Sequence, residues 1–154
     1  MANERDFSDL INQIDQILGK CSAPAPCLKR ICEFLRDNVE YFDWVGFYLA
    51  NGDKEQLTLG PYVGEPTEHQ RIEYGRGVCG QSAQLGQTQV IQDVTQESNY
   101  LACSPEVKSE IVIPIKRQDQ LKALIDIDSH DSAPFEDADK RFLKTIAEKV
   151  EPLF

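Results

Sequence analysis

The chain has 154 residues, of which 41% are hydrophobic and 27% charged, and its formal net charge at pH 7 is −10. This length is enough for one domain, residues 1–154, whose core needs no disulfide or metal support. The acidic balance argues against nucleic acid or an anionic membrane as a partner, because both attract Lys and Arg. No apolar run is long enough to cross a bilayer, and the first residues lack the basic and apolar parts of a signal peptide. We therefore expect a cytoplasmic protein.

Two amphipathic helices are predicted near the N-terminus. Apolar side chains recur at three- and four-residue spacing over residues 7–18, with Asp6 able to cap this helix and Gly19 expected to end it. Residues 22–26, Ser-Ala-Pro-Ala-Pro, are interpreted as a linker, because proline does not continue a helix. A second helix is predicted from about Pro26, with an apolar stripe made of Leu28, Ile31, Cys32, Leu35 and Val39.

The middle and end of the chain are dominated by predicted strands. Aromatic and β-branched residues favour strands at 44–50 and 56–59, joined by a turn at Asn51-Gly52-Asp53, and residues 60–67 are predicted to form a loop over a pocket. The remaining predicted elements are a short helix at 78–85, a strand at 88–91, a polar loop at 93–100, a hairpin of strands 109–115 and 123–129, and a helix at 137–150. Hairpins rather than long crossovers indicate an α+β fold: a central antiparallel sheet with helices packed on one side and pocket-forming loops on the other.

Five cysteines, an odd number, fit a reducing compartment better than a secreted disulfide framework, so we expect thiols that are buried or redox-active. Without a close Cys-x-x-Cys pair, and with only two histidines, a structural zinc site is not expected, and we predict no metal. Cys32 lies on the apolar stripe and is predicted to be a small core side chain. Cys79 and Cys103 instead lie in polar, Gly-containing surroundings. They are either incidental small residues or thiols that act chemically, which requires access and thiolate character.

Two aspartates interrupt an apolar strand in Ile125-Asp126-Ile127-Asp128-Ser129. Alternation places both carboxylates on one face of the sheet, and Glu110 on the neighbouring strand adds a third. Burying them against an apolar layer would cost several kcal/mol for each charge, so a polar pocket is the favoured interpretation. There they would bind an ammonium group, or share a proton and act as an acid. The alternative is an exposed strand face on which the aspartates meet water.

The aromatic residues Trp44 and Tyr48 are four residues apart on a predicted strand and therefore share a face. They are either core residues or the wall of a pocket that holds a cation. His69 is predicted to lie in a surface loop, and the role of His130 is left open.

Taken together and in order, six motifs resemble the free methionine-(R)-sulfoxide reductases, which are single-domain members of the GAF family. These motifs are Trp44-Val45-Gly46-Phe47-Tyr48, Gly60-Pro61-Tyr62, Gly75-Arg76-Gly77-Val78-Cys79-Gly80, Cys103, Lys108-Ser109-Glu110-Ile111-Val112-Ile113-Pro114-Ile115 and Ile125-Asp126-Ile127-Asp128-Ser129. The resemblance covers nearly the whole chain and implies a GAF-type fold. Because many GAF domains are purely sensory, the fold alone does not imply chemistry.

The resemblance implies that Cys103 is the catalytic cysteine, which attacks the sulfoxide sulfur and becomes a sulfenic acid as methionine leaves. By the same resemblance, Glu110, Asp126 and Asp128 bind the substrate amino group and protonate the sulfoxide oxygen. The implied activity is the reduction of free L-methionine-(R)-sulfoxide.

Trp44 and Tyr48 would then wall the pocket around the substrate methyl group, and Cys79 would match a second family cysteine that resolves the sulfenic acid. The resemblance further implies a homodimer, no bound cofactor, and an external thiol reductant such as thioredoxin.

One position departs from the family pattern. A further cysteine, which usually forms a disulfide with the catalytic one, is expected ten residues before Cys79, and this chain has His69 there. Reduction of the Cys103 sulfenic acid would then depend on Cys79, on a thioredoxin-like thiol or on a small thiol. Two alternatives therefore remain: a non-catalytic GAF sensor that binds a small zwitterion, and a redox sensor that forms a disulfide between Cys79 and Cys103.

Overall fold

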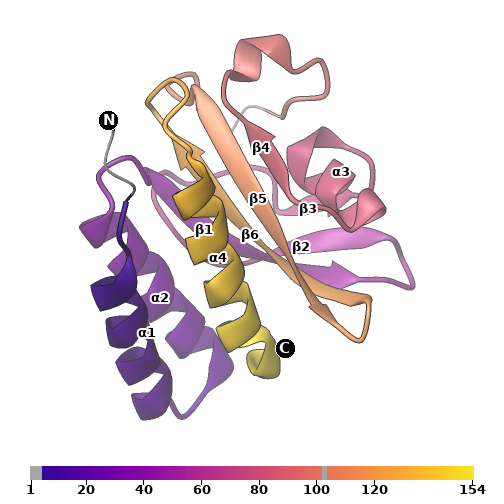
Figure 1. Cartoon of the computed structure of the whole chain (residues 1–154). Coiled ribbons are helices and arrows are strands. Elements are labelled where there is room, and N and C mark those ends of the chain that lie inside the picture. The colour runs from indigo at the N-terminus through magenta and orange to yellow at the C-terminus, as the bar shows by residue number, and fades with distance from the viewer. Residues whose placement is uncertain (1–4, 102–103) are drawn as a thin grey trace.

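The computed structural model describes residues 5–101 and 104–154. Within these residues, six strands form one antiparallel sheet in the order β3-β2-β1-β6-β5-β4 (Figure 1). The strands are β1 (Trp44–Asn51), β2 (Gln56–Val63), β3 (Arg71–Glu73), β4 (Gln89–Ile91), β5 (Ser109–Arg117) and β6 (Gln120–Ser129). The predicted α+β class with a central antiparallel sheet is therefore confirmed.

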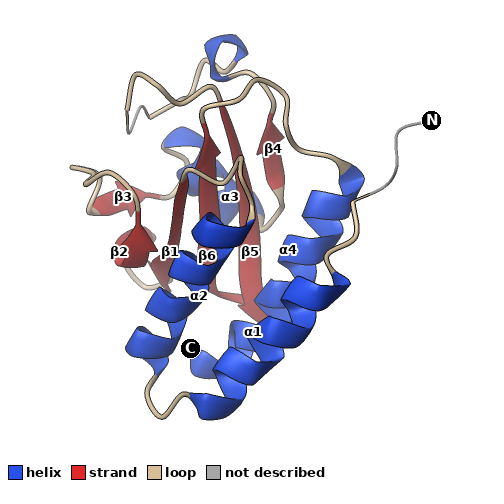
Figure 2. Cartoon of the chain, turned by 90° about the vertical axis from the view of Figure 1, so that its left-hand side faces the viewer, coloured by secondary structure: helices blue, strands red, loops and turns tan. Residues whose placement is uncertain are grey.

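Three long helices cover one face of the sheet (Figure 2): α1 (Ser8–Lys20), α2 (Pro24–Asn38) and α4 (Asp137–Val150). The helix α2 contacts β1 and β2, α4 contacts β5, and α1 packs across α2 and α4. The short helix α3 (Gly77–Leu85) lies on the opposite face among the loops, as Figure 1 shows. Short 3-10 helices are η1 (Val94–Gln96) and η2 (Glu151–Leu153). In the described part of the chain, no helix has the length and apolar character needed to span a membrane.

Strict alternation along the strands produces two apolar layers. The larger core lies under the three long helices and takes its side chains from one face of the sheet, including Val45, Phe47, Ile113, Ile125 and Ile127. The opposite face carries a smaller cluster, which includes Trp44, Tyr48, Val112, Leu124 and, from α3, Cys79. Since the side-chain period of a strand is two, the residues between the core positions of β6 must lie on this second face.

Two of the predicted boundaries that are wrong lie at prolines. The helix α1 also runs one residue past Gly19, which was expected to end it, and its N-cap is Phe7 rather than Asp6. The helix α2 begins at Pro24, because proline suits the first helical turn, where its missing N–H has no helical partner. Strand β2 continues through Pro61 to Val63, although these residues were predicted to lie in a loop. Between the pairs Tyr48–Leu59 and Gly46–Tyr62 the register shifts, so β2 contains a bulge at this proline.

The three cysteines near the N-terminus stabilise the fold, two through a disulfide and one by packing in the core. Cys21 and Cys27 form a disulfide with a Cα–Cα distance of 5.4 Å, which joins the α1–α2 connection to the first turns of α2. The interpretation of these residues as free thiols is therefore wrong, because a separation of six positions along the chain still allows a turn to bring them together. Cys32 is fully buried in the larger core, as predicted.

Candidate active site

Three carboxylates lie together on the face of the sheet opposite the long helices. Glu110 on β5 is paired across the ladder with Asp128 on β6, and Asp126 lies one pair further along the same face, opposite Val112. Their exposed fractions are 5% for Glu110 and 1% for each aspartate. The alternative of an exposed strand face is therefore excluded, and the alternation predicted for Asp126 and Asp128 is confirmed.

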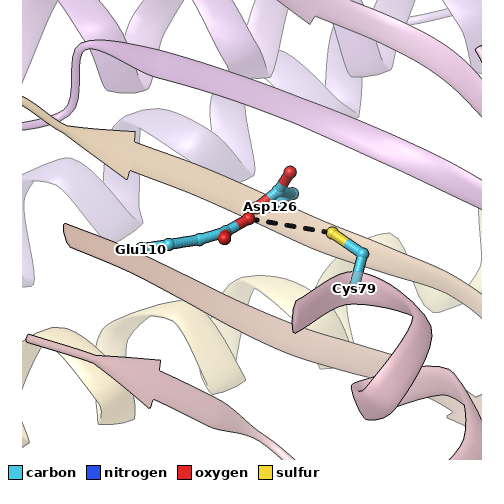
Figure 3. Close-up of side chains that lie close together, drawn as sticks. All are labelled: Cys79, Glu110 and Asp126. Carbon is cyan, nitrogen blue, oxygen red and sulfur yellow. Dashed lines mark hydrogen bonds between the residues drawn. The ribbon is translucent and has the colours of Figure 1, made fainter. Parts of the chain in front are cut away.

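Cys79 reaches this row from α3, as Figure 3 shows. Its Sγ lies 3.9 Å from Oε2 of Glu110. The helix starts after a turn in which Gly75 and Gly77 adopt φ angles of 89° and 67°, conformations that favour glycine. Asn99 holds this turn, because its amide donates to the Gly75 carbonyl at 2.9 Å and its oxygen accepts from the Gly77 N–H at 2.9 Å. The glycine turn thus aims the first residues of α3 at the carboxylates.

The buried surroundings change the acidity of these groups. Desolvation raises the pKa of Asp126, and hydrogen bonds from Glu110 and Cys79 offset this only in part. Desolvation also raises the pKa of Cys79 well above its usual value, and the neighbouring charges of Asp126 and Glu110 add to the effect. Asp126 therefore retains a proton more readily than an exposed aspartate, which suits an acid. Cys79 is a thiol at neutral pH and, in this state, a weak nucleophile.

Aromatic side chains form the wall beside the carboxylates. The Trp44 ring stacks on Tyr48 at 6.4 Å and on Tyr62 at 5.3 Å between ring centroids. Its Nε1 donates to the Glu65 carbonyl at 3.0 Å. Trp44 and Tyr48 thus share a face as predicted, whereas the sequence reasoning did not place Tyr62 in the wall. The signal for Tyr62 was its position opposite Gly46 across the β1–β2 hairpin.

Two cavities flank the carboxylate row. The smaller, about 10 Å³, is lined by residues that include Tyr48, His69, Cys79, Leu101, Glu110 and Asp126. The larger, about 110 Å³, is lined by residues that include Arg36, Asp43, Trp44, Ser104, Asp128 and His130. The row therefore presents Glu110 and Asp126 to one cavity and Asp128 to the other.

The two histidines occupy different environments. His69 lies in a loop, as predicted, but its side chain is half-buried against the smaller cavity and not fully on the surface. Its loop is held in place because the His69 carbonyl accepts from the Tyr48 hydroxyl at 3.0 Å and the Gln70 carbonyl accepts from the Leu59 N–H at 2.8 Å. His130 lies at the larger cavity, with Nδ1 3.8 Å from Asp43 Oδ2.

Cys103, the predicted catalytic cysteine, lies outside the described residues. Its described neighbours lie at the site: Leu101 lines the smaller cavity and Ser104 lines the larger one. Among the described residues, Cys79, Glu110 and Asp126 offer donor atoms close enough to hold a metal ion.

The GAF domain family model matches residues 24–151. The chain belongs to the GAF domain family. A curated relative, GAF domain-containing protein A of Dictyostelium discoideum, is 34% identical over 145 residues, 94% of this chain and 90% of that protein. The free methionine-R-sulfoxide reductase of Saccharomyces cerevisiae is 40% identical over 110 residues, 70% of this chain and 61% of that protein.

Among solved structures, this GAF domain is similar to the free methionine-R-sulfoxide reductase of Neisseria meningitidis in complex with its substrate. The TM-score is 0.90 and the identity 30%, and the match covers 100% of this chain and 93% of the other. The GAF-type fold and the resemblance to this group of reductases are thereby confirmed.

Proposed function

We propose that this GAF domain reduces free L-methionine-(R)-sulfoxide to methionine, with Cys103 as the nucleophile. The observation that carries the proposal is the buried row of Glu110, Asp126 and Asp128 beside the Trp44 ring. Buried carboxylates of this kind suit a ligand that brings an ammonium group and an oxygen to be protonated. Relatives named as reductases of this substrate support the same assignment.

The proposed chemistry needs one nucleophile and one acid. The Cys103 thiolate attacks the sulfoxide. The Cys103 sulfur gains the oxygen as the S–O bond of the substrate breaks, and one proton is taken up. The products are methionine and a Cys103 sulfenic acid. We assign the proton to Asp126, since burial raises its pKa. Asp128 and Glu110 then face the substrate ammonium group, and the aromatic wall contacts its methyl group.

Reduction of the sulfenic acid is assigned to an external thiol, thioredoxin-like or small. Two thiols reduce the sulfenic acid to the Cys103 thiol, with release of water and formation of one disulfide. Cys79 stays a predicted resolving residue, but the high pKa of its buried thiol does not favour the thiolate that resolution requires. The same argument weighs against the redox-sensor alternative. The alternative of a non-catalytic sensor is not favoured, because relatives that match most of this chain are named as reductases.

The assignment of the nucleophile is tested by replacing single cysteines. Cys103→Ser should abolish methionine formation, whereas Cys32→Ala, which changes a thiol in the core on the other side of the sheet, should keep it. A Cys103→Ser protein with wild-type turnover contradicts the assignment. The single domain, the homodimer and the cytoplasmic location remain predictions; light scattering of the purified chain tests the dimer.

A further inference from the structure

Three potential metal ligands converge in the candidate site from separate elements. Cys79 comes from α3, Glu110 from β5 and Asp126 from β6, and their donor atoms lie within 4.8 Å of one another (Figure 3). All three side chains are buried. Ligands this far apart in the chain leave no spacing motif, which is why the sequence predicted no metal.

Two further observations point to a small ligand at this cluster. Oδ1 of Asp126 is buried and has no hydrogen-bond partner among the described residues, and Asp126 is only 1% exposed. A buried oxygen without a partner costs free energy that a bound cation would recover. The adjoining cavity of about 10 Å³ has room for roughly one water molecule or one ion.

We propose that Cys79, Glu110 and Asp126 bind Zn²⁺. Zn²⁺ displaces the protons of the Cys79 thiol and of Asp126 into solvent as it binds. The resulting thiolate and two carboxylates are a donor set that zinc accepts, at about 2.3 Å for sulfur and about 2.0–2.2 Å for oxygen. Tetrahedral ligands at these lengths lie roughly 3.5 Å apart, so the donors, now within 4.8 Å of one another, need to draw in by at most about 1.3 Å. Calcium and magnesium are disfavoured, because they prefer all-oxygen sites with more ligands. Three protein ligands leave a fourth position open.

Zinc at this position has a functional consequence that rests on the proposed function. Glu110 and Asp126 would hold both the ion and the substrate, so the two exclude each other. Zinc therefore acts as a competitive inhibitor of sulfoxide reduction.

Cobalt(II) provides a spectroscopic test, because a cobalt–thiolate bond gives a charge-transfer band in the near ultraviolet. The whole chain carrying Cys103→Ser is titrated with Co²⁺ without added thiol. We expect one equivalent to produce the band and Zn²⁺ to remove it. Adding Cys79→Ser should abolish the band, whereas adding Cys32→Ala, a matched buried thiol, should leave it unchanged. No band, or a band that survives Cys79→Ser, overturns the proposal.

Glu110→Gln is a second test that keeps the thiol in place. It should weaken Zn²⁺ binding at least tenfold, measured by competition with a chromophoric chelator, while Glu148→Gln on the surface helix α4 should have no effect. Unchanged affinity in a folded Glu110→Gln protein contradicts the site. Binding without any reductase activity would remove the proposed function alone, and activity without metal binding would remove the zinc site alone.

Discussion

Gly46 is the position at which a single methyl group should disturb the site most directly. It lies on β1 between Asp126 and Tyr62 on the neighbouring strands. A Cβ built on Gly46 would lie 2.5 Å from Cη2 and 2.7 Å from Cζ3 of Trp44, and 2.8 Å from Cβ of Tyr62. These contacts are shorter than van der Waals packing allows, so Gly46→Ala must displace the Trp44 indole or bend the strand. The wall of the pocket then loses its geometry.

The expected loss of stability follows from two opposing effects. Overpacking a well-filled site costs about 1–3 kcal/mol, and replacing glycine in a strand returns up to about 1 kcal/mol. The middle of these two ranges gives a net loss of about 1.5 kcal/mol, which corresponds to a melting temperature lower by roughly 3–6 °C for a chain of this size. Because Trp44 is the single tryptophan of the chain, its fluorescence emission should also shift.

The matched control is Gly52→Ala, where an added Cβ meets no atom within 4 Å. It should keep the wild-type melting temperature and emission. Thermal unfolding followed by circular dichroism, with emission spectra of both variants, checks the prediction. A Gly46→Ala protein that matches Gly52→Ala in both measurements refutes the close packing of the indole against this strand.

Further predictions concern the acid, the aromatic wall and the disulfide. Burial raises the pKa of Asp126 in the folded protein above its unfolded value of about 3.9. The stability contributed by the protonated Asp126 side chain is therefore complete below a pH of about 3.9 and is lost as pH rises through the folded-state pKa. As pH rises from the unfolded to the folded pKa, Asp126→Asn should therefore gain stability relative to the wild type, by at most about 1.4 kcal/mol for each pH unit. The measurement is the free energy of unfolding in urea as a function of pH; parallel curves for the two proteins contradict the raised pKa. Tyr48→Phe removes the bond to the His69 carbonyl and should cost about 0.5–1.5 kcal/mol in the same assay; an unchanged midpoint contradicts the bond. Cys21→Ser opens a short loop to Cys27 and should cost about 2 kcal/mol, a loss that dithiothreitol should reproduce in the wild type but not in the variant.

The carboxylate row could be predicted from the sequence because it depends on local rules. Strand alternation places Asp126 and Asp128 on one face, and the short hairpin brings Glu110 beside them. Charged side chains at every second position of an apolar strand indicate that this face of the strand borders a polar site, and the two cavities are that site.

What could not be predicted depends on contacts between distant segments. Cys79 approaches Glu110 over 31 positions of the chain, and Asn99 holds the glycine turn at Gly77 over 22 positions, so no local pattern records either contact. His69 was assigned to the surface because its polar loop has no visible partner in the sequence, yet a bond from Tyr48 holds the loop over the pocket. The bulge in β2 was missed for a related reason, since only the partner strand shows that the ladder resumes beyond it.

The central claim is tested most directly by single-turnover release of methionine. The purified chain is mixed with excess free L-methionine-(R)-sulfoxide without reductant, and Cys103→Ser serves as the control. We expect about one methionine per wild-type chain, none from the variant, and continued release from the wild type once dithiothreitol or thioredoxin is added. No methionine from the wild type under either condition would contradict the assignment of this GAF domain as a sulfoxide reductase.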